Sequence, residues 1–244
     1  MPISANTLFH FTKDFETLLS ILKSKFFPRL RLEQQLMPQL PRLAVPMVCF
    51  CDIPLSHISE HTSKYGRYAI GIRKDWAMGQ GVSPVLYVHD HSLIPHTILS
   101  EIIRLSNEYK AGNSSVAPKM MRYLDTVCMM KRYEAFDERL NAIVRYYDER
   151  EWRYVPPRET DDQLCYLLEE FYQKEELRNK VNAVNENYGV VFNPDVINYI
   201  IVDTDQEVMR LKHNIEQIKE GFSYKSVQLL TTRILSMERI EEDM

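Results

Sequence analysis

The sequence predicts a mixed α+β fold in a single domain spanning residues 1–244, with a helical hairpin inserted at about residues 92–145. Predicted strands gather in an early and a late part of the chain, and the helices between them have irregular lengths. That order differs from the regular strand–helix alternation of a doubly wound fold. No glycine-rich phosphate loop follows a predicted strand. With 244 residues, of which 45% are hydrophobic, the chain can bury one large core.

Short runs rich in β-branched and aromatic residues predict the strands. In the first half of the chain these runs lie at 7–12, 45–53, 67–72 and 84–88. In the second half they lie at 152–155, at 190–193 and 196–202, which form two strands or one bent strand, and at 227–235. Residues 28–46 contain four prolines and are predicted to form a loop.

Apolar side chains at helical spacing predict the helices. They occur at 14–25. Residues 55–64 are predicted to form a short polar helix, and residues 96–109 and 116–132 two helical stretches within the insertion. Thr160 with Gln163 forms a capping-box pattern for a helix that continues to Phe171, and Thr204 with Glu207 forms another before a further helix.

Composition argues against several classes of function. The formal net charge of −4 gives no general basic face, so we expect no generic nucleic-acid binding. The four cysteines and seven histidines have no zinc-like spacing, so we expect no metal and free thiols. The first residues do not read as a signal peptide, and no apolar run reaches about 18 residues. We therefore expect a cytoplasmic protein without a membrane span.

The segment Glu149-Arg150-Glu151-Trp152-Arg153 is the first candidate for chemistry. In an extended strand Glu149, Glu151 and Arg153 would project from one face. Two neighbouring carboxylates raise each other's proton affinity, and an arginine beside them lowers it. A carboxylate in such a setting can hold a ribose hydroxyl or stabilise a cationic sugar transition state. The alternative interpretation is a solvated, charged strand edge.

Histidines and cysteines provide weaker candidates. His10 lies between two phenylalanines and would point away from them, either to contact a ligand or to fill an ordinary place in the fold. His57 and His61 have helical i, i+4 spacing but lack the glutamate of zinc proteases, which favours surface histidines. Cys49 and Cys51 would share a strand face without a base nearby, which favours buried thiols over a nucleophile.

Several separated blocks resemble the AbiGi family of bacterial abortive-infection proteins. In chain order they are Leu8-Phe9-His10-Phe11-Thr12, Val48-Cys49-Phe50-Cys51-Asp52-Ile53-Pro54-Leu55, His61 to Gly66, Ile70 to Trp76, Pro84 to Val88, Glu149 to Tyr154 and Leu229 to Leu235. The resemblance implies phage defence. It also implies a partner, because the family is usually labelled an antitoxin and paired with a nucleotidyltransferase-like toxin.

A more distant resemblance concerns chemistry. A first strand with His-aromatic-Thr, aromatic-rich strands and a late Glu-X-Glu strand are similar to ADP-ribosyltransferases of the DarT-like kind, with a mainly antiparallel sheet. That likeness implies NAD as substrate and a macromolecular acceptor. It implies Glu151 as the catalytic glutamate, preceded by Glu149. It further implies NAD contacts by His10, Thr12, Tyr65 and Tyr68. The Ser-Thr-Ser triplet of that superfamily is absent, and Phe50-Cys51-Asp52 lies near its place.

Three functions follow as hypotheses. The chain transfers ADP-ribose from NAD or hydrolyses NAD, with Glu151 supporting the sugar cation. Alternatively it is an inactive antitoxin or regulator that neutralises a toxin by protein–protein contact. A DNA-binding autoregulator is disfavoured by the acidic balance and by the lack of a basic recognition helix.

Overall fold

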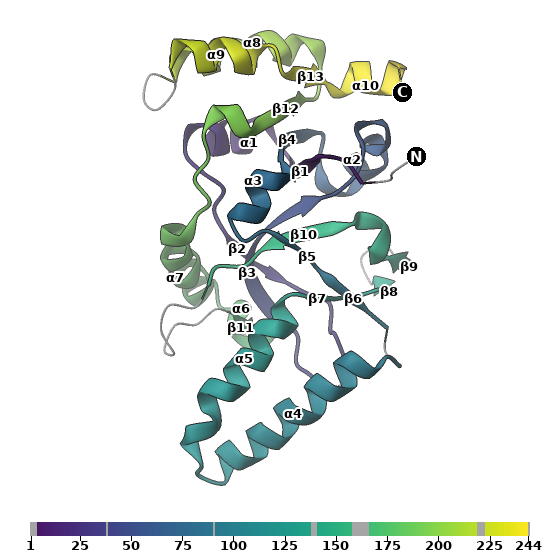
Figure 1. Cartoon of the computed structure of the whole chain (residues 1–244), viewed down its shortest axis with the longest axis vertical. Coiled ribbons are helices and arrows are strands. Elements are labelled where there is room, and N and C mark those ends of the chain that lie inside the picture. Colours follow the sequence, from purple (N-terminus) through teal and green to yellow (C-terminus); the bar gives the residue numbers. More distant parts are fainter. Residues whose placement is uncertain are drawn as a thin grey trace.

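The computed structural model describes residues 4–37, 39–89, 91–137, 141–157, 166–218 and 223–243. These residues form an α+β fold around a mixed, mainly antiparallel sheet, in the order β13-β12-β4-β1-β3-β10-β5 (Figure 1). The fold class predicted from the sequence is therefore confirmed at this level. No helix within the described ranges is both long and apolar enough to span a bilayer.

The central strands of the sheet pair antiparallel. They are β1 (Thr7–Thr12), β3 (Leu43–Cys51), β4 (Tyr68–Arg73), β10 (Glu151–Tyr154) and β12 (Ile197–Val202). At the edges, β13 (Ile234–Ser236) runs parallel to β12, and β5 (Ser83–Pro84) pairs with β10. Two further strands, β2 (Arg29–Leu32) and β11 (Leu167–Leu168), pair with the first half of β3.

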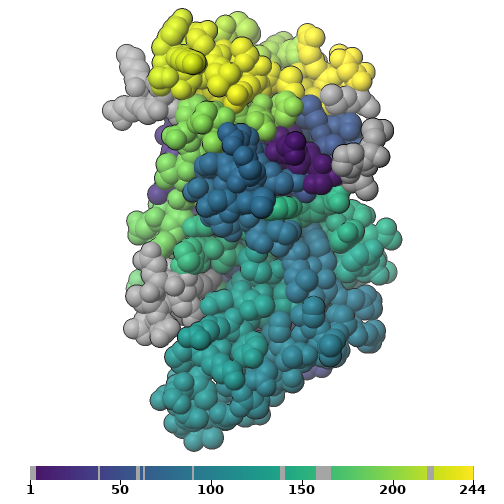
Figure 2. Space-filling view, viewed as in Figure 1, coloured from purple at the N-terminus to yellow at the C-terminus, as the bar shows by residue number. Residues whose placement is uncertain are grey.

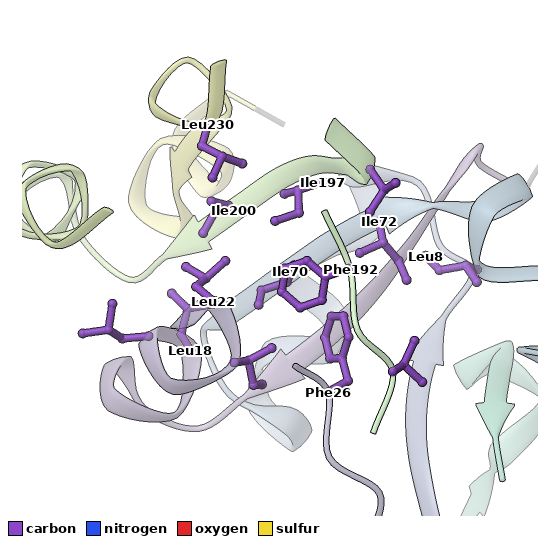
Figure 3. Packing of buried hydrophobic residues seen from close by; sticks show 14 of the residues in the cluster. Leu8, Leu18, Leu22, Phe26, Ile70, Ile72, Phe192, Ile197, Ile200 and Leu230 are labelled. Atoms are coloured by element: carbon purple, nitrogen blue, oxygen red, sulfur yellow. The ribbon is translucent and has the colours of Figure 1, made fainter. Parts of the chain in front are cut away.

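Helices cover both faces of this sheet because each strand alternates its apolar side chains between them. One face packs against helices α1 (Phe15–Lys23), α3 (Lys74–Gly79), α8 (Asp205–Gln217) and α9 (Tyr224–Thr231). Figure 3 shows this core, where Leu18 and Leu22 of α1 meet Ile70 and Ile200 of the sheet. The opposite face packs against a 3₁₀ turn at Leu55–His57 and the helices α2 (Ser59–Tyr65) and α10 (Met237–Asp243).

The stretch predicted as a helical insertion begins with two helices and continues with short strands. Helices α4 (Leu93–Lys110) and α5 (Ala117–Cys128) form a hairpin that extends away from the main sheet (Figures 1 and 2). Strand β6 (Leu86–Val88) pairs parallel with β7 (Met130–Arg132). Strands β8 (Glu134–Asp137) and β9 (Ala142–Arg145) then form an antiparallel ribbon, which a 3₁₀ turn at Tyr146–Glu149 connects to β10.

Several predictions about elements were wrong. Residues 28–46 contain β2 and the start of β3, because Pro46 is accommodated in a pairing opposite Leu30. Residues 167–168, expected within a helix, form β11, which pairs with Leu43 and Ala44 and is followed by α6 (Glu169–Tyr172). The capping pair of the expected helix, Thr160 and Gln163, lies outside the described residues. Residues 190–193, expected to be extended, contribute only an isolated bridge between Val190 and Phe26. Residues 130–132, expected to end a helix, form β7.

The strand predicted at 227–235 was also wrong, and its cause is clear. Ser223 caps α9 by accepting the backbone N–H of Ser226, and Val227 and Leu230 fall on the buried side of that helix. The chain becomes extended only at β13. A capped, amphipathic helix has outweighed the β-branched content of this segment.

The segment between β11 and β12 is mainly helical. Helix α7 (Glu175–Asn185) packs its Val181 beside β2, and a short 3₁₀ turn at Pro194–Val196 precedes β12.

Gly66 joins α2 to β4 in a conformation that other residues rarely adopt, with φ at +108°. A Cβ atom there would lie 2.1 Å from the carbonyl oxygen of Thr12, a backbone atom that cannot move aside. We expect Gly66→Ala to reduce the free energy of unfolding by about 3 kcal/mol. Gly79→Ala is the matched control, since no atom lies within 4 Å of its added Cβ. Urea unfolding of both variants tests this, and equal midpoints would contradict it.

Candidate functional site: a buried charge cluster

Glu149 and Glu151 are brought together by an unusual backbone conformation at the residue between them. Arg150 has a φ of 47°, a left-handed conformation that is uncommon outside glycine. Its N–H donates to the Tyr147 carbonyl at 3.2 Å, and its own carbonyl accepts the Asp52 N–H at 3.0 Å. The chain thereby turns from the 3₁₀ segment into β10 with both carboxylates on the same side.

Both carboxylates bind a single ammonium group. Lys131 Nζ of β7 lies 2.6 Å from Glu149 Oε2 and 2.6 Å from Glu151 Oε2. The lysine also sits over the ring of Tyr146, with Nζ 5.0 Å from the ring centroid. Lys131 was not identified from the sequence as a site residue.

Arg153 completes the cluster on the other side of Glu151. Its Nε donates to Glu151 Oε1 at 2.8 Å, and its Nη2 donates to Glu33 Oε2 at 2.8 Å. The remaining donor, Nη1, reaches the backbone carbonyl of Cys128 at the end of α5, at 2.6 Å. The arginine thus connects β10 with the residue after β2 and with the helical hairpin. We call the five charged residues Glu33, Lys131, Glu149, Glu151 and Arg153 the charge cluster.

The charge cluster is buried. The Arg153 side chain has no exposed surface, and Glu149 and Glu151 are each 5% exposed. Strand β10 lies between β3 and β5 and is not an edge strand. The interpretation of this segment as a solvated strand edge is therefore wrong.

Charge pairing keeps Glu151 and Lys131 ionised despite burial. Burial alone would raise the pKa of the Glu151 carboxyl, but Arg153 and Lys131 outweigh it and lower that pKa to about 2. Burial alone would lower the pKa of the Lys131 ammonium, but the surrounding glutamates, Glu151 first, raise it well above its ordinary value. Three carboxylates and two cations leave one formal negative charge in this region.

Tyrosine and cysteine side chains enclose the carboxylates. Tyr65 at the end of α2 hydrogen-bonds Glu149, and burial followed by this carboxylate raises the pKa of its phenol. Tyr87 Oη accepts the backbone N–H of Glu151 at 2.8 Å. The Cys49 thiol hydrogen-bonds Glu151, and burial raises the pKa of both Cys49 and Cys51. A raised thiol pKa disfavours the thiolate that a nucleophile needs.

His10 lies on the opposite face of the sheet from Glu151. Phe9 pairs with Cys51 and Cys51 pairs with Glu151, so these three share one face. His10 projects to the other face, where its ring lies 5.2 Å from that of Phe26. Its Nδ1–H donates to the Cys49 carbonyl at 2.7 Å. Burial lowers the pKa of the imidazole to about 4, so it is neutral near pH 7.

Thr12 and Tyr68 also lie apart from the charge cluster. They are directly opposite each other in the pairing of β1 with β4, on the His10 face. Thr12 Oγ1 donates to the Asp14 carbonyl at 3.3 Å, and Tyr68 Oη donates to Glu207 at 3.1 Å. Of the residues expected to contact NAD, the structure therefore brings only Tyr65 to the two glutamates. His10, Thr12 and Tyr68 do not line a cleft with Glu151.

Other candidates have separate environments. His57 is exposed in its 3₁₀ turn, as expected for a surface histidine, whereas His61 is buried. The rings of His61, Phe11 and Tyr65 form a triangle, with centroids 6.2–6.4 Å apart. Cys51 and Cys128 are buried and Cys49 is half-buried, and none of these three cysteines is in a disulfide. Cys165 lies outside the described residues. Within the described ranges, no group of three or more metal-binding side chains is placed to hold an ion.

The hollow beside the charge cluster is too small for a nucleotide. It has a volume of about 20 Å³ and is lined by Glu33 together with Gln34, Leu36, Leu40, Pro41, Leu43, Val45, Val127 and Met130. That volume holds about one water molecule, whereas sites for small molecules enclose roughly 300–1,000 Å³. A hollow of about 340 Å³ lies elsewhere, between Arg67 and the acidic side chains of α10.

Comparisons with known proteins decide the family. A family model described as "Putative abortive phage resistance protein AbiGi, antitoxin" matches residues 25–203. The chain belongs to the AbiGi family. A relative from Lactococcus lactis subsp. cremoris, named "Abortive phage resistance protein AbiGi", is 26% identical over 220 residues, which cover 82% of this chain and 88% of that protein. No solved structure matches the chain.

The AbiGi match contains the whole charge cluster, from Glu33 to Arg153, together with Tyr65 and Tyr87. It excludes β1 with His10, and it excludes the C-terminal helices from α8 onward. The family resemblance seen in the sequence is thereby confirmed. The likeness to an ADP-ribosyltransferase core has no support from a solved structure and stays a prediction.

Proposed function

We propose that this AbiGi protein acts in phage defence as an antitoxin, which neutralises a toxin by direct protein–protein contact and carries out no chemistry of its own. The family description names an antitoxin, and the Lactococcus relative is named for phage resistance. The partner expected from the family resemblance is a nucleotidyltransferase-like protein.

The observation that carries this proposal is the internal neutralisation of Glu151. One carboxylate oxygen accepts from Arg153 and the other accepts from Lys131, at 2.8 and 2.6 Å. A glutamate that supports a sugar cation must offer its charge to the substrate during the reaction. Here that charge is already balanced by two cations, and the hollow of about 20 Å³ beside Glu33 leaves no room for a dinucleotide. The cluster instead joins β10, β7 and the β2–β3 connection.

The alternative is NAD-dependent transfer with Glu151 as the catalytic glutamate and with His10, Thr12, Tyr65 and Tyr68 at the dinucleotide. It requires His10 and Glu151 to approach one ligand, although they project from opposite faces of the sheet. Glu151→Gln separates the two hypotheses, because a transferase loses NAD turnover in this variant and an antitoxin has none to lose.

The experiment combines both readouts. We expect that inducing the nucleotidyltransferase-like partner alone arrests growth, and that co-expression of this chain restores it. Nicotinamide release from NAD should stay at background for the purified chain, for the Glu151→Gln variant and for the exposed control Glu16→Gln. Circular dichroism confirms that each variant is folded. Failure to restore growth, or nicotinamide release that Glu151→Gln abolishes, would refute the proposal.

A further inference from the structure

The ribbon of β8 and β9 presents an unusual outer face. Its inner face is part of a small core, in which Ala135, Val144 and Tyr146 pack with Tyr87. The outer face should then be polar, as in most two-stranded ribbons that rest on a core. Instead Phe136 and Ile143 lie directly opposite each other on it and are 54% and 73% exposed. The ribbon lies at the margin of the molecule (Figure 1).

The charges on this face are balanced. Glu134 and Arg145 lie directly opposite each other, next to the apolar pair along the strands. With one charge of each sign among the described residues of β8 and β9 on this face, those residues provide no excess of cations with which to bind nucleic acid or an anionic membrane. A short two-stranded ribbon is also only marginally stable, so an additional cover over its apolar pair would stabilise it. These properties indicate a protein surface as the occupant.

The outer face is complementary to itself. Consider a two-fold axis that lies just outside this outer face, parallel to the strands and above the line midway between β8 and β9. It places Phe136 over Ile143 of a second copy and Glu134 over Arg145 of that copy. The same operation forms both contacts twice, as an isologous interface requires. We propose that two copies of this chain associate through this face, ribbon against ribbon.

An exposed ring, Tyr147, lies just beyond β9 in the 3₁₀ turn. Two neighbouring rings restrain it, with centroids 5.3 Å away for Tyr133 and 5.2 Å away for Tyr87. A ring fixed in this way loses little conformational entropy on contact. The surface remains small beside the roughly 800 Å² per partner of a standard interface. The dimer should therefore dissociate on dilution.

The first test uses the purified full chain alone. Sedimentation velocity over a concentration series should show a shift from the mass of one chain to that of two. Ile143→Glu should raise the dissociation constant at least about tenfold, because it places a carboxylate against Phe136 of the second copy. Met209→Glu adds the same charge at an exposed apolar position on α8, 67% exposed, and should leave the dissociation constant unchanged.

A second test reports on the pairing itself. Glu134→Arg and Arg145→Glu should each be monomeric when alone, since like charges then meet across the axis. An equimolar mixture of the two variants should form heterodimers, because opposite charges again face each other between the copies. Repulsion within each ribbon persists in the mixture, so recovery on mixing can only come from contact between copies.

A single mass at every concentration would overturn the proposal and leave this face to a different protein. A mixture of the charge variants that stays monomeric would overturn it too. The dimer does not depend on the proposed antitoxin function. If the parent chain forms no dimer but neutralises the toxin, only the dimer is refuted. If it forms the dimer but does not neutralise the toxin, only the antitoxin function is refuted.

Discussion

Replacing Lys131 with methionine should reduce the free energy of unfolding by about 3–5 kcal/mol near neutral pH, which is the cost of breaking a buried ion pair from one side. The substitution leaves Glu149 and Glu151 buried on the same side without the ammonium that now lies 2.6 Å from each. For a chain of this size the midpoint of thermal unfolding should fall by roughly 10 °C. Differential scanning calorimetry measures both quantities.

The pH dependence distinguishes this cause from lost packing. In the parent protein the pKa of Glu151 is lowered to about 2 from an ordinary value of 4.5, so its pairing stabilises the fold above pH 4.5. This stabilisation is lost as the pH falls towards 2. In Lys131→Met the buried carboxylates should have raised pKa values instead, and protonation should stabilise the variant as the pH falls through them.

The difference in stability between Lys131→Met and the parent should therefore shrink below about pH 5. Lys212→Met on exposed α8 is the control and should match the parent at every pH. The triple variant Lys131→Met, Glu149→Gln, Glu151→Gln should recover part of the lost stability, since it removes the uncompensated charges. A constant deficit over the whole pH range would show that Lys131 acts through packing alone.

The strands that carry strong local patterns could be predicted from the sequence. The run from Thr7 to Thr12 and the run ending at Cys51 combine aromatic or β-branched residues with clear breaks, and both are strands. Elements that depend on distant partners could not. Leu167 and Leu168 have helical spacing with their neighbours, yet they pair with Leu43 and Ala44, more than a hundred residues away. Local periodicity contains no information about such a pairing.

The candidate site was predictable only in part for the same reason. The shared face of Glu151 and Arg153 follows from the two-residue period of a strand, and the two side chains are hydrogen-bonded. Glu149 lies outside the strand, in the 3₁₀ turn, and reaches the same side through the left-handed turn at Arg150. That turn was not visible, because arginine has no preference for it. Lys131 and Glu33 lie 20 and 118 residues before Glu151 in the sequence, and neither stands in a recognisable motif. Lys131 and Arg153 decide whether the two glutamates are free to react. The roles of the glutamates could therefore not be judged without the structure.

Arg153→Met should have an effect as large as that of Lys131→Met, about 3–5 kcal/mol of unfolding free energy. The side chain is fully buried, and its loss removes the donor to Glu33 and to the Cys128 carbonyl and leaves Lys131 as the remaining cation at Glu151. Because that carbonyl ends α5, the damage should extend into the helical hairpin. Hydrogen exchange should therefore increase at the C-terminal turn of α5 as well as in β10.

Two comparisons make this prediction specific. Arg153→Lys keeps the charge but cannot reach three acceptors in a planar fork, so it should recover less than half of the lost stability. Arg104→Met, on the exposed surface of α4, removes a guanidinium paired with Glu101 and Glu108 in solvent and should cost at most about 1 kcal/mol. If Arg153→Met were no more destabilising than Arg104→Met, the charge cluster would not be the connection between the sheet and the hairpin.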